Sequence, residues 1–248
     1  MRKLNLNNLI WFMILAGFSY YIYDLVATDK ILIFIHPKML KYVIFSLIVF
    51  ILLAVIQLGS LFGKVSSGKL KIGYLIFIIP LFLGFAVNPQ GLSSDVAAKK
   101  GVTMNQYQEI GKTANNGVQN IIEDGVIAFN EADFSIILGE LFENPDKYAD
   151  NEVIITGFVF RDEDLEKNQI IVARMLLNCC AADAQVVGMV CEGENVKDLA
   201  DDQWIRVKGR LGTTNYHNRF FNRDETIPYI KVDYIDEIER PTNMYVYP

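Results

Sequence analysis

The chain has 248 residues, 52% of them hydrophobic, and carries 29 acidic against 23 basic side chains. This apolar content argues against a purely soluble protein, and three cysteines are too few for a disulfide framework. Charge is also uneven, since residues 1–90 hold eight basic and two acidic side chains while residues 91–248 hold 15 basic and 27 acidic ones. A membrane-embedded part followed by an acidic, water-exposed part is typical of this asymmetry. We therefore expect no nucleic-acid partner, because phosphates are bound mainly by basic side chains.

Three apolar runs in the first 90 residues predict transmembrane helices at about residues 6–27, 39–62 and 70–88. The third run contains Pro80, which a membrane helix tolerates where neighbouring groups satisfy the freed carbonyl. Signal peptides share the basic start, but two more apolar runs follow it. Residues 1–90 are therefore expected to be an uncleaved membrane anchor.

Basic residues beside the first span indicate the orientation of this anchor. Arg2 and Lys3 precede the span, and such residues favour the cytoplasmic side of a bilayer. Three spans then place everything after residue 88 on the opposite side. The prediction is a multi-pass protein of the cell membrane with an extracytoplasmic C-terminal domain.

Residues 91–125 are rich in Gly, Ser, Asn, Gln and Lys, which predicts a linker. Asn130 then follows a short apolar stretch and is expected to cap an amphipathic helix that ends at Asn144 and Pro145. The apolar residues of this helix recur at helical spacing, so one face must be buried, and an end of a barrel would bury it. They are Phe134, Ile137, Leu138, Leu141 and Phe142.

The rest of the C-terminal part has the alternating pattern of strands. We expect five strands with a short helix at Val196–Leu199 and a long loop at Thr213–Thr226; the strands are Glu152–Phe160, Gln169–Leu177, Gln185–Cys191, Trp204–Leu211 and Tyr229–Ile238. This order is typical of a small Greek-key barrel of the OB type. The predicted fold class is a membrane-anchored α+β protein: three N-terminal transmembrane helices, a linker, and an OB-like domain over residues 126–248.

Cys179 and Cys180 follow the second of these strands, and Asp183 comes three residues later. Adjacent side chains point in different directions from a regular strand, so both thiols can face one ligand only if the backbone turns there. Two thiolates and a carboxylate suit zinc or another soft metal, with Cys191 or His217 as a further candidate ligand. Two alternatives stay open: the pair consists of small buried residues at a strand end, or it is a redox pair.

Catalytic patterns are not legible elsewhere. The chain has two histidines, one of them beside the predicted membrane segment, and no glycine-rich phosphate loop. We therefore expect no enzyme and no cofactor beyond a metal ion.

Several motifs resemble those of the YcgQ-type family of bacterial proteins, described as subunits of a two-component membrane permease. They are Ile35-His36-Pro37, Pro80-Leu81-Phe82-Leu83-Gly84, Gly157-Phe158-Val159, and Asn178-Cys179-Cys180-Ala181-Ala182-Asp183 followed by Trp204 and Gly209. The resemblance implies a multi-spanning permease partner, related to exporters of organic arsenicals, and it supplies no catalytic residue.

The expected function is therefore that of a permease accessory subunit that contributes assembly, gating or substrate capture. The alternatives are a metal- or thiol-ligand-binding sensor or redox protein, and an envelope-anchored interaction module.

Overall fold

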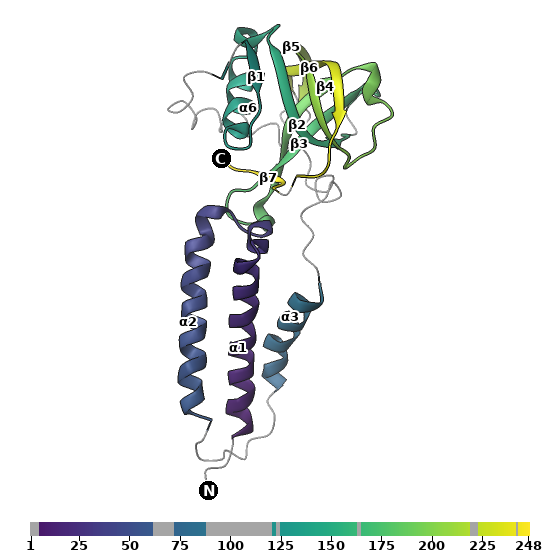
Figure 1. Ribbon diagram of the computed structural model, residues 1–248. Helices are drawn as coiled ribbons and strands as arrows, with labels where there is room; N and C mark the ends of the chain where they lie inside the picture. Colours follow the sequence, from purple (N-terminus) through teal and green to yellow (C-terminus); the bar gives the residue numbers. More distant parts are fainter. Residues whose placement is uncertain are drawn as a thin grey trace. The chain divides into compact units, whose positions relative to one another are not determined.

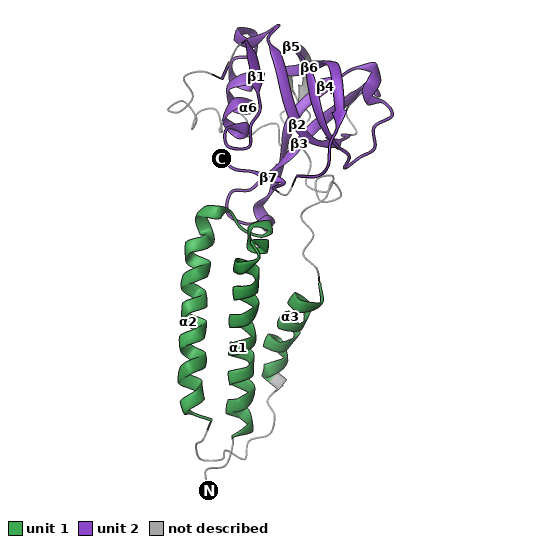
Figure 2. Ribbon diagram, in the orientation of Figure 1, with its two compact units in different colours: residues 1–91 green, residues 92–248 purple. Residues whose placement is uncertain are grey.

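The computed structural model describes residues 5–61, 72–87, 121–122, 125–162, 165–218, 223–241 and 243–248. The chain forms two compact units, Met1–Gly91 and Leu92–Pro248 (Figure 2). Nearly all of the predicted linker, residues 91–125, lies outside the described residues.

The first unit is helical (Figure 1). Its helices are α1 (Leu6–Ala27), α2 (Leu40–Gly59) and α3 (Leu75–Ala86), with 3-10 turns at Lys30–Ile33, Pro37–Met39 and Ile72–Tyr74. By length and composition, Leu6–Ala27 and Pro37–Gly59 are able to cross a membrane. Helix α3 has 12 residues and rises about 18 Å, less than the roughly 30 Å of a hydrocarbon core. Two apolar helices near the N-terminus are thus compatible with membrane anchoring, whereas the predicted third span is not confirmed.

Two glycines let α1 and α3 approach closely. A Cβ atom on Gly17 would lie 2.6 Å from Leu81 Cδ2, and one on Gly84 would lie 2.8 Å from the Cζ atom of Tyr21. Small residues at helix contacts are typical of membrane helices, which gain little from hydrophobic burial against each other. Helix α3 therefore packs against α1 through pairs of one small and one large residue.

The second unit is a β-barrel with one α-helix (Figure 1). The strands are β1 (Val126–Ala128), β2 (Glu152–Phe160), β3 (Gln169–Leu176), β4 (Gln185–Glu192), β5 (Trp204–Asn218), β6 (Arg223–Glu237) and β7 (Tyr245–Val246). Helix α6 spans Phe134–Glu143, and 3-10 turns lie at Pro145–Tyr148, Ala181–Asp183 and Glu194–Val196.

Five strands close the barrel in the order β2-β5-β6-β4-β3, because β3 pairs back to β2. Every contact around the ring is antiparallel except β4 with β6, which is parallel. The short strands β1 and β7 add in parallel to β2 and β3. The predicted five-stranded barrel is confirmed.

Alternating side chains of the strands fill the barrel interior, and α6 covers it. Residues Val153, Ile155, Val172 and Met189 are fully buried in one cluster with α6. The buried residues of α6 in that cluster are Phe134, Ile137, Leu138 and Leu141, four of the five predicted for its apolar face; Phe142 is partly buried against it.

Asn130 acts one turn earlier than the sequence suggests. Its Oδ1 accepts hydrogen bonds from the backbone N–H groups of Ala132 and Asp133, at 3.0 and 2.8 Å, and so closes the turn that precedes α6. The helix itself begins at Phe134.

Two predictions about connections are wrong. The expected helix at Val196–Leu199 is a 3-10 turn at Glu194–Val196. The expected loop at Thr213–Thr226 largely belongs to β5 and β6, which stay paired as far as Asn218 and Arg223. This hairpin extends beyond the barrel, so it lacks the apolar alternation by which strands are recognised, while backbone pairing still satisfies its polar groups.

Gly157 lies where β2 passes from its partner β5 to its partner β3, and this change closes the barrel. A Cβ atom there would lie 2.4 Å from the backbone oxygen of Ala173.

Because a backbone atom cannot move as a side chain does, we expect Gly157→Ala to lower the free energy of unfolding by about 1–3 kcal/mol. Chemical unfolding of the full chain in detergent, followed by circular dichroism, measures this. Gly59→Ala, which meets nothing within 4 Å, is the control, and an unchanged Gly157→Ala midpoint would contradict the close approach.

Glu140 ties α6 to the following turn. Its Oε1 accepts from Tyr148 Oη at 2.8 Å, from Lys147 Nζ at 3.1 Å and from Asn144 Nδ2 at 3.3 Å. Burial alone would raise the pKa of Glu140, but these donors outweigh it and the pKa is lowered.

A lowered carboxyl pKa stabilises the fold above the unfolded-state pKa, and the contribution is lost as pH falls through the folded-state value. We expect Glu140→Gln to cost about 1 kcal/mol at neutral pH and almost nothing well below pH ~4. Unfolding of both proteins at several pH values gives the difference. If the difference in free energy of unfolding between the two proteins does not become smaller in acid, the charge of Glu140 is not involved.

Candidate metal centre

The cysteine pair lies in the loop between β3 and β4, and both ends of this loop are anchored. Leu177 is fully buried, and its backbone N–H donates to the Val246 carbonyl at 3.0 Å. At the other end Ala184 is also buried. Between these anchors Cys179 is exposed and Cys180 is half-buried. The thiols are therefore held at the surface by a fixed frame.

Asp183 folds this loop back on itself. Its Oδ2 accepts from the Cys179 N–H at 2.9 Å and its Oδ1 from the Cys180 N–H at 3.3 Å. The Asp183 N–H in turn donates to the Cys180 carbonyl at 3.0 Å. These bonds make the turn that two adjacent cysteines need if both are to face one point.

The sulfur atoms of Cys179 and Cys180 and a carboxylate oxygen of Asp183 all lie within 4.8 Å of one another. Two sulfurs bound to one tetrahedral zinc ion, each about 2.3 Å from it, stand roughly 3.8 Å apart. The two sulfur atoms, at most 4.8 Å apart, would need to approach each other by about 1 Å at most to reach that geometry. The arrangement fits a thiophilic cation with three protein ligands.

The cluster holds a proton that a metal ion could displace. Hydrogen bonding to the Asp183 carboxylate, assisted by Cys180, raises the pKa of Cys179 to about 11. For Asp183 itself burial would raise the pKa, but bonds from the Cys179 thiol and from backbone N–H groups outweigh it and lower the pKa. A cation competes for these sites because it binds thiolate and carboxylate, so its binding would release protons.

Cys191 does not join this cluster. It is fully buried in the barrel core, where its Sγ donates to the Met189 carbonyl at 3.7 Å and burial raises its pKa. Cys191 pairs with Ile170 and lies six residues along β4 from Gln185, where the loop ends. Along a strand this separates Cys191 from the loop by about 20 Å.

His217 lies opposite Asp224 in the extended hairpin, and its side chain lies outside the described residues. The cluster found in the described part of the chain therefore has three members.

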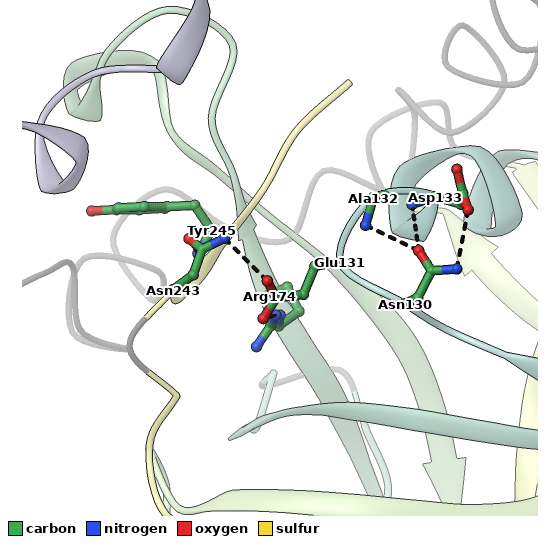
Figure 3. A network of polar contacts seen from close by, with 7 residues as sticks. All are labelled: Asn130, Glu131, Ala132, Asp133, Arg174, Asn243 and Tyr245. Carbon is green, nitrogen blue, oxygen red and sulfur yellow. Dashed lines mark hydrogen bonds and ion pairs between the residues drawn. The ribbon is translucent and has the colours of Figure 1, made fainter. Parts of the chain in front are cut away.

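A buried arginine is a polar feature for which no role was expected. Arg174 of β3 is 3% exposed and donates from Nη2 to Glu131 Oε1 at 3.2 Å. Its guanidinium stands 5.0 Å from the ring centre of Trp204, and burial lowers its pKa. Asn243 completes the network by donating to Glu131 Oε2 at 3.3 Å (Figure 3).

The signal for this residue is visible in the sequence, because Arg174 interrupts an otherwise apolar strand. Through Glu131, which accepts from both Arg174 and Asn243, the turn before α6, strand β3 and the C-terminal segment are joined, although they lie far apart in the chain. Among the described residues Nε and Nη1 have no hydrogen-bond partner. Arg174 thus fixes the packing around β3 and contributes no ligand to the cysteine cluster.

Comparison with known proteins gives matches along nearly the whole chain. The model of the DUF1980 N-terminal domain matches residues 10–103, and that of the DUF1980 C-terminal domain matches residues 104–248. The UPF0703 protein YcgQ of Bacillus subtilis (strain 168) is 23% identical, over 95% of this chain and 98% of its own length.

Among solved structures, a small single-stranded DNA-binding protein from Streptomyces coelicolor matches 36% of this chain and 94% of its own chain, with 15% identity and a TM-score of 0.23. The mitochondrial single-stranded DNA-binding protein Rim1 of S. cerevisiae matches 37% of this chain and 98% of its own, with 9% identity and a TM-score of 0.25.

These structures correct the expectation about partners. Both are named as single-stranded DNA-binding proteins, so excluding a nucleic-acid partner on the basis of the acidic net charge was wrong. A net charge does not determine what one face of a small barrel contacts. The likeness is too low to argue that this chain binds DNA, and none of the matched names supports the expected permease partner.

The shared proton of Cys179 makes its reactivity a test of the loop geometry. Because the pKa of Cys179 is raised to about 11, its thiolate is scarce at neutral pH, and alkylation by iodoacetamide should accelerate only in alkaline solution. Asp183→Asn removes the negative charge, so we expect Cys179 to react at least several-fold faster at neutral pH. Mass spectrometry with site localisation measures both rates on the full chain in detergent. Equal rates in the two proteins would mean that Asp183 does not hold the thiol proton.

Proposed function

The chain belongs to the DUF1980 family, as its resemblance to the YcgQ-type proteins predicts, and on this premise we propose that it is a membrane-anchored metal-binding protein. The ion is held by Cys179, Cys180 and Asp183. The observation that carries the proposal is the convergence of two sulfurs and one carboxylate oxygen within 4.8 Å on an anchored loop. Soft thiolate ligands select zinc and related thiophilic ions over magnesium or calcium.

The domain that carries the site is proposed to be an OB-like barrel outside the cytoplasm. Support for the OB assignment is the strand order, in which β2, β3 and β4 form a meander and β4 meets β6 in parallel. Support for the location is the set of basic residues before α1, which favours a cytoplasmic N-terminus. This location also requires a third crossing by residues 70–88, of which the 12-residue helix α3 is one part.

Binding of a metal ion accounts for this loop better than redox chemistry does. Cys179, Cys180 and Cys191 are free thiols, and a disulfide between sequence neighbours would strain the peptide that joins them. A raised thiol pKa also opposes redox attack, for which thiolate is the reactive form. A role as permease accessory subunit and a role as an interaction module both stay predictions.

Metal content tests the proposed function. The full chain is purified in detergent under reducing conditions, incubated with zinc, desalted and analysed by elemental mass spectrometry. We expect about one zinc ion per chain, and we expect Cys179→Ser, Cys180→Ser and Asp183→Asn each to weaken binding at least tenfold, because each removes one of three ligands.

Cys191→Ala is the matched control, because it removes the core thiol and leaves the loop intact. It should keep the full zinc content. A wild-type chain that retains no zinc, or a Cys191→Ala chain that loses as much as the loop variants, would overturn the proposal.

A further inference from the structure

The cysteine loop is held in shape by bonds that need no metal ion. Asp183 accepts from two backbone N–H groups, its own N–H donates to Cys180, and Ala184 N–H donates to Ala181 at 3.4 Å. The barrel supplies the outer anchor, since Leu177 is bonded to Val246. In a structural zinc site, by contrast, the ion organises the chain around it, and its removal unfolds the domain. Here the strand pairing and the core cluster of the barrel are made without the side chains of Cys179, Cys180 and Asp183.

The ligand set is also open as far as the described residues show it. The described part of the chain brings three ligand atoms together, whereas structural zinc sites are closed by four protein ligands. Cys179 is exposed, so another molecule can approach the ion from the solvent side. Within the described residues the fourth position is thus left to water or to an external ligand.

One of the three ligands has an alternative set of partners. Both oxygens of Asp183 accept backbone N–H groups of the same loop. If the carboxylate leaves the ion, it returns to these donors at little cost, because a hydrogen-bonded carboxylate is stable without the cation. Asp183 is thus suited to be a ligand that releases the ion easily.

From these three features we propose that the loop is an exchange site, which passes a thiophilic cation to or from thiolate ligands of another molecule instead of retaining it. This inference rests on the proposed function of metal binding. It adds the chemistry of the partner, which must offer at least one thiol or a comparable soft donor.

The exchange is a ligand substitution in which every bond is balanced. An incoming thiol loses its proton to solvent and binds the ion at the open position. The Asp183 carboxylate leaves and accepts its two backbone N–H groups more fully. When each cysteine then dissociates, its sulfur takes up a proton and a further donor of the incoming molecule takes its place on the metal. The oxidation state of metal and sulfur does not change.

The rate law of metal release tests the inference. The full chain in detergent is loaded with zinc and mixed in a stopped-flow instrument with increasing concentrations of dithiothreitol, with a zinc-responsive dye as indicator. An open site predicts a release rate that rises in proportion to dithiol concentration. We expect circular dichroism of the barrel to be the same before and after release.

Asp183→Asn and Asp146→Asn form a matched pair of variants. Asp146 is an exposed carboxylate elsewhere in the domain, so its variant should release zinc at the wild-type rate. Asp183→Asn keeps an oxygen for the loop but loses the charge, so release should be at least tenfold faster.

The outcomes separate the two proposals. If the chain retains no zinc, the proposed function fails and exchange fails with it. If zinc is bound but its release rate does not depend on the dithiol concentration, or release collapses the circular dichroism signal, the site is a retained structural one and the exchange inference alone is overturned.

Discussion

The chemistry of the loop depends on one carboxylate that accepts hydrogen bonds from two consecutive backbone N–H groups. Asp183 draws the N–H groups of Cys179 and Cys180 toward the same point. In a regular strand their side chains would point to opposite faces. The turn places both sulfurs beside the carboxylate that made it. The same group is thus the cause of the geometry and a candidate ligand within it.

The barrel makes this local arrangement rigid. Strands β3 and β4 are paired along their whole length and end together at Leu176 and Gln185, so the loop begins and finishes at fixed points. Strand β7 holds the residue after β3, while Arg174 and Glu131 fix the C-terminal segment from the other side. A buried guanidinium is costly unless it is paired. Its ion pair and its contact with Trp204 therefore restrict how this region can pack.

Much of the barrel was predictable because its strands alternate cleanly. The bounds of β2 match the expected ones, and β3 and β4 differ by one residue. The extended hairpin of β5 and β6 was missed because its faces carry no apolar alternation beyond Thr213. The third membrane span was expected over residues 70–88, whereas α3 covers Leu75–Ala86, because the apolar run begins before the α-helix and includes the 3-10 turn Ile72–Tyr74. The composition of the sequence therefore located the apolar segments, whereas the lengths of the helices came only from the structure.

The sequence indicated the kinds of residue that form the candidate site, but not all of the residues that belong to it. Cys179, Cys180 and Asp183 lie close together in the chain, so a turn sufficed to join them. Cys191 was expected at the end of a strand, but the sequence alone does not say that its side chain points into the core. Arg174 was visible as a charge in an apolar strand, but its partners lie 43 and 30 residues away and could not be inferred.

X-ray absorption at the zinc edge of the loaded full-length chain identifies the ligand atoms around the ion. We expect two sulfur neighbours per zinc at about 2.3 Å and the remaining neighbours to be oxygen or nitrogen. A zinc ion with no sulfur neighbour, or with four, would contradict the assignment of the site to Cys179, Cys180 and Asp183.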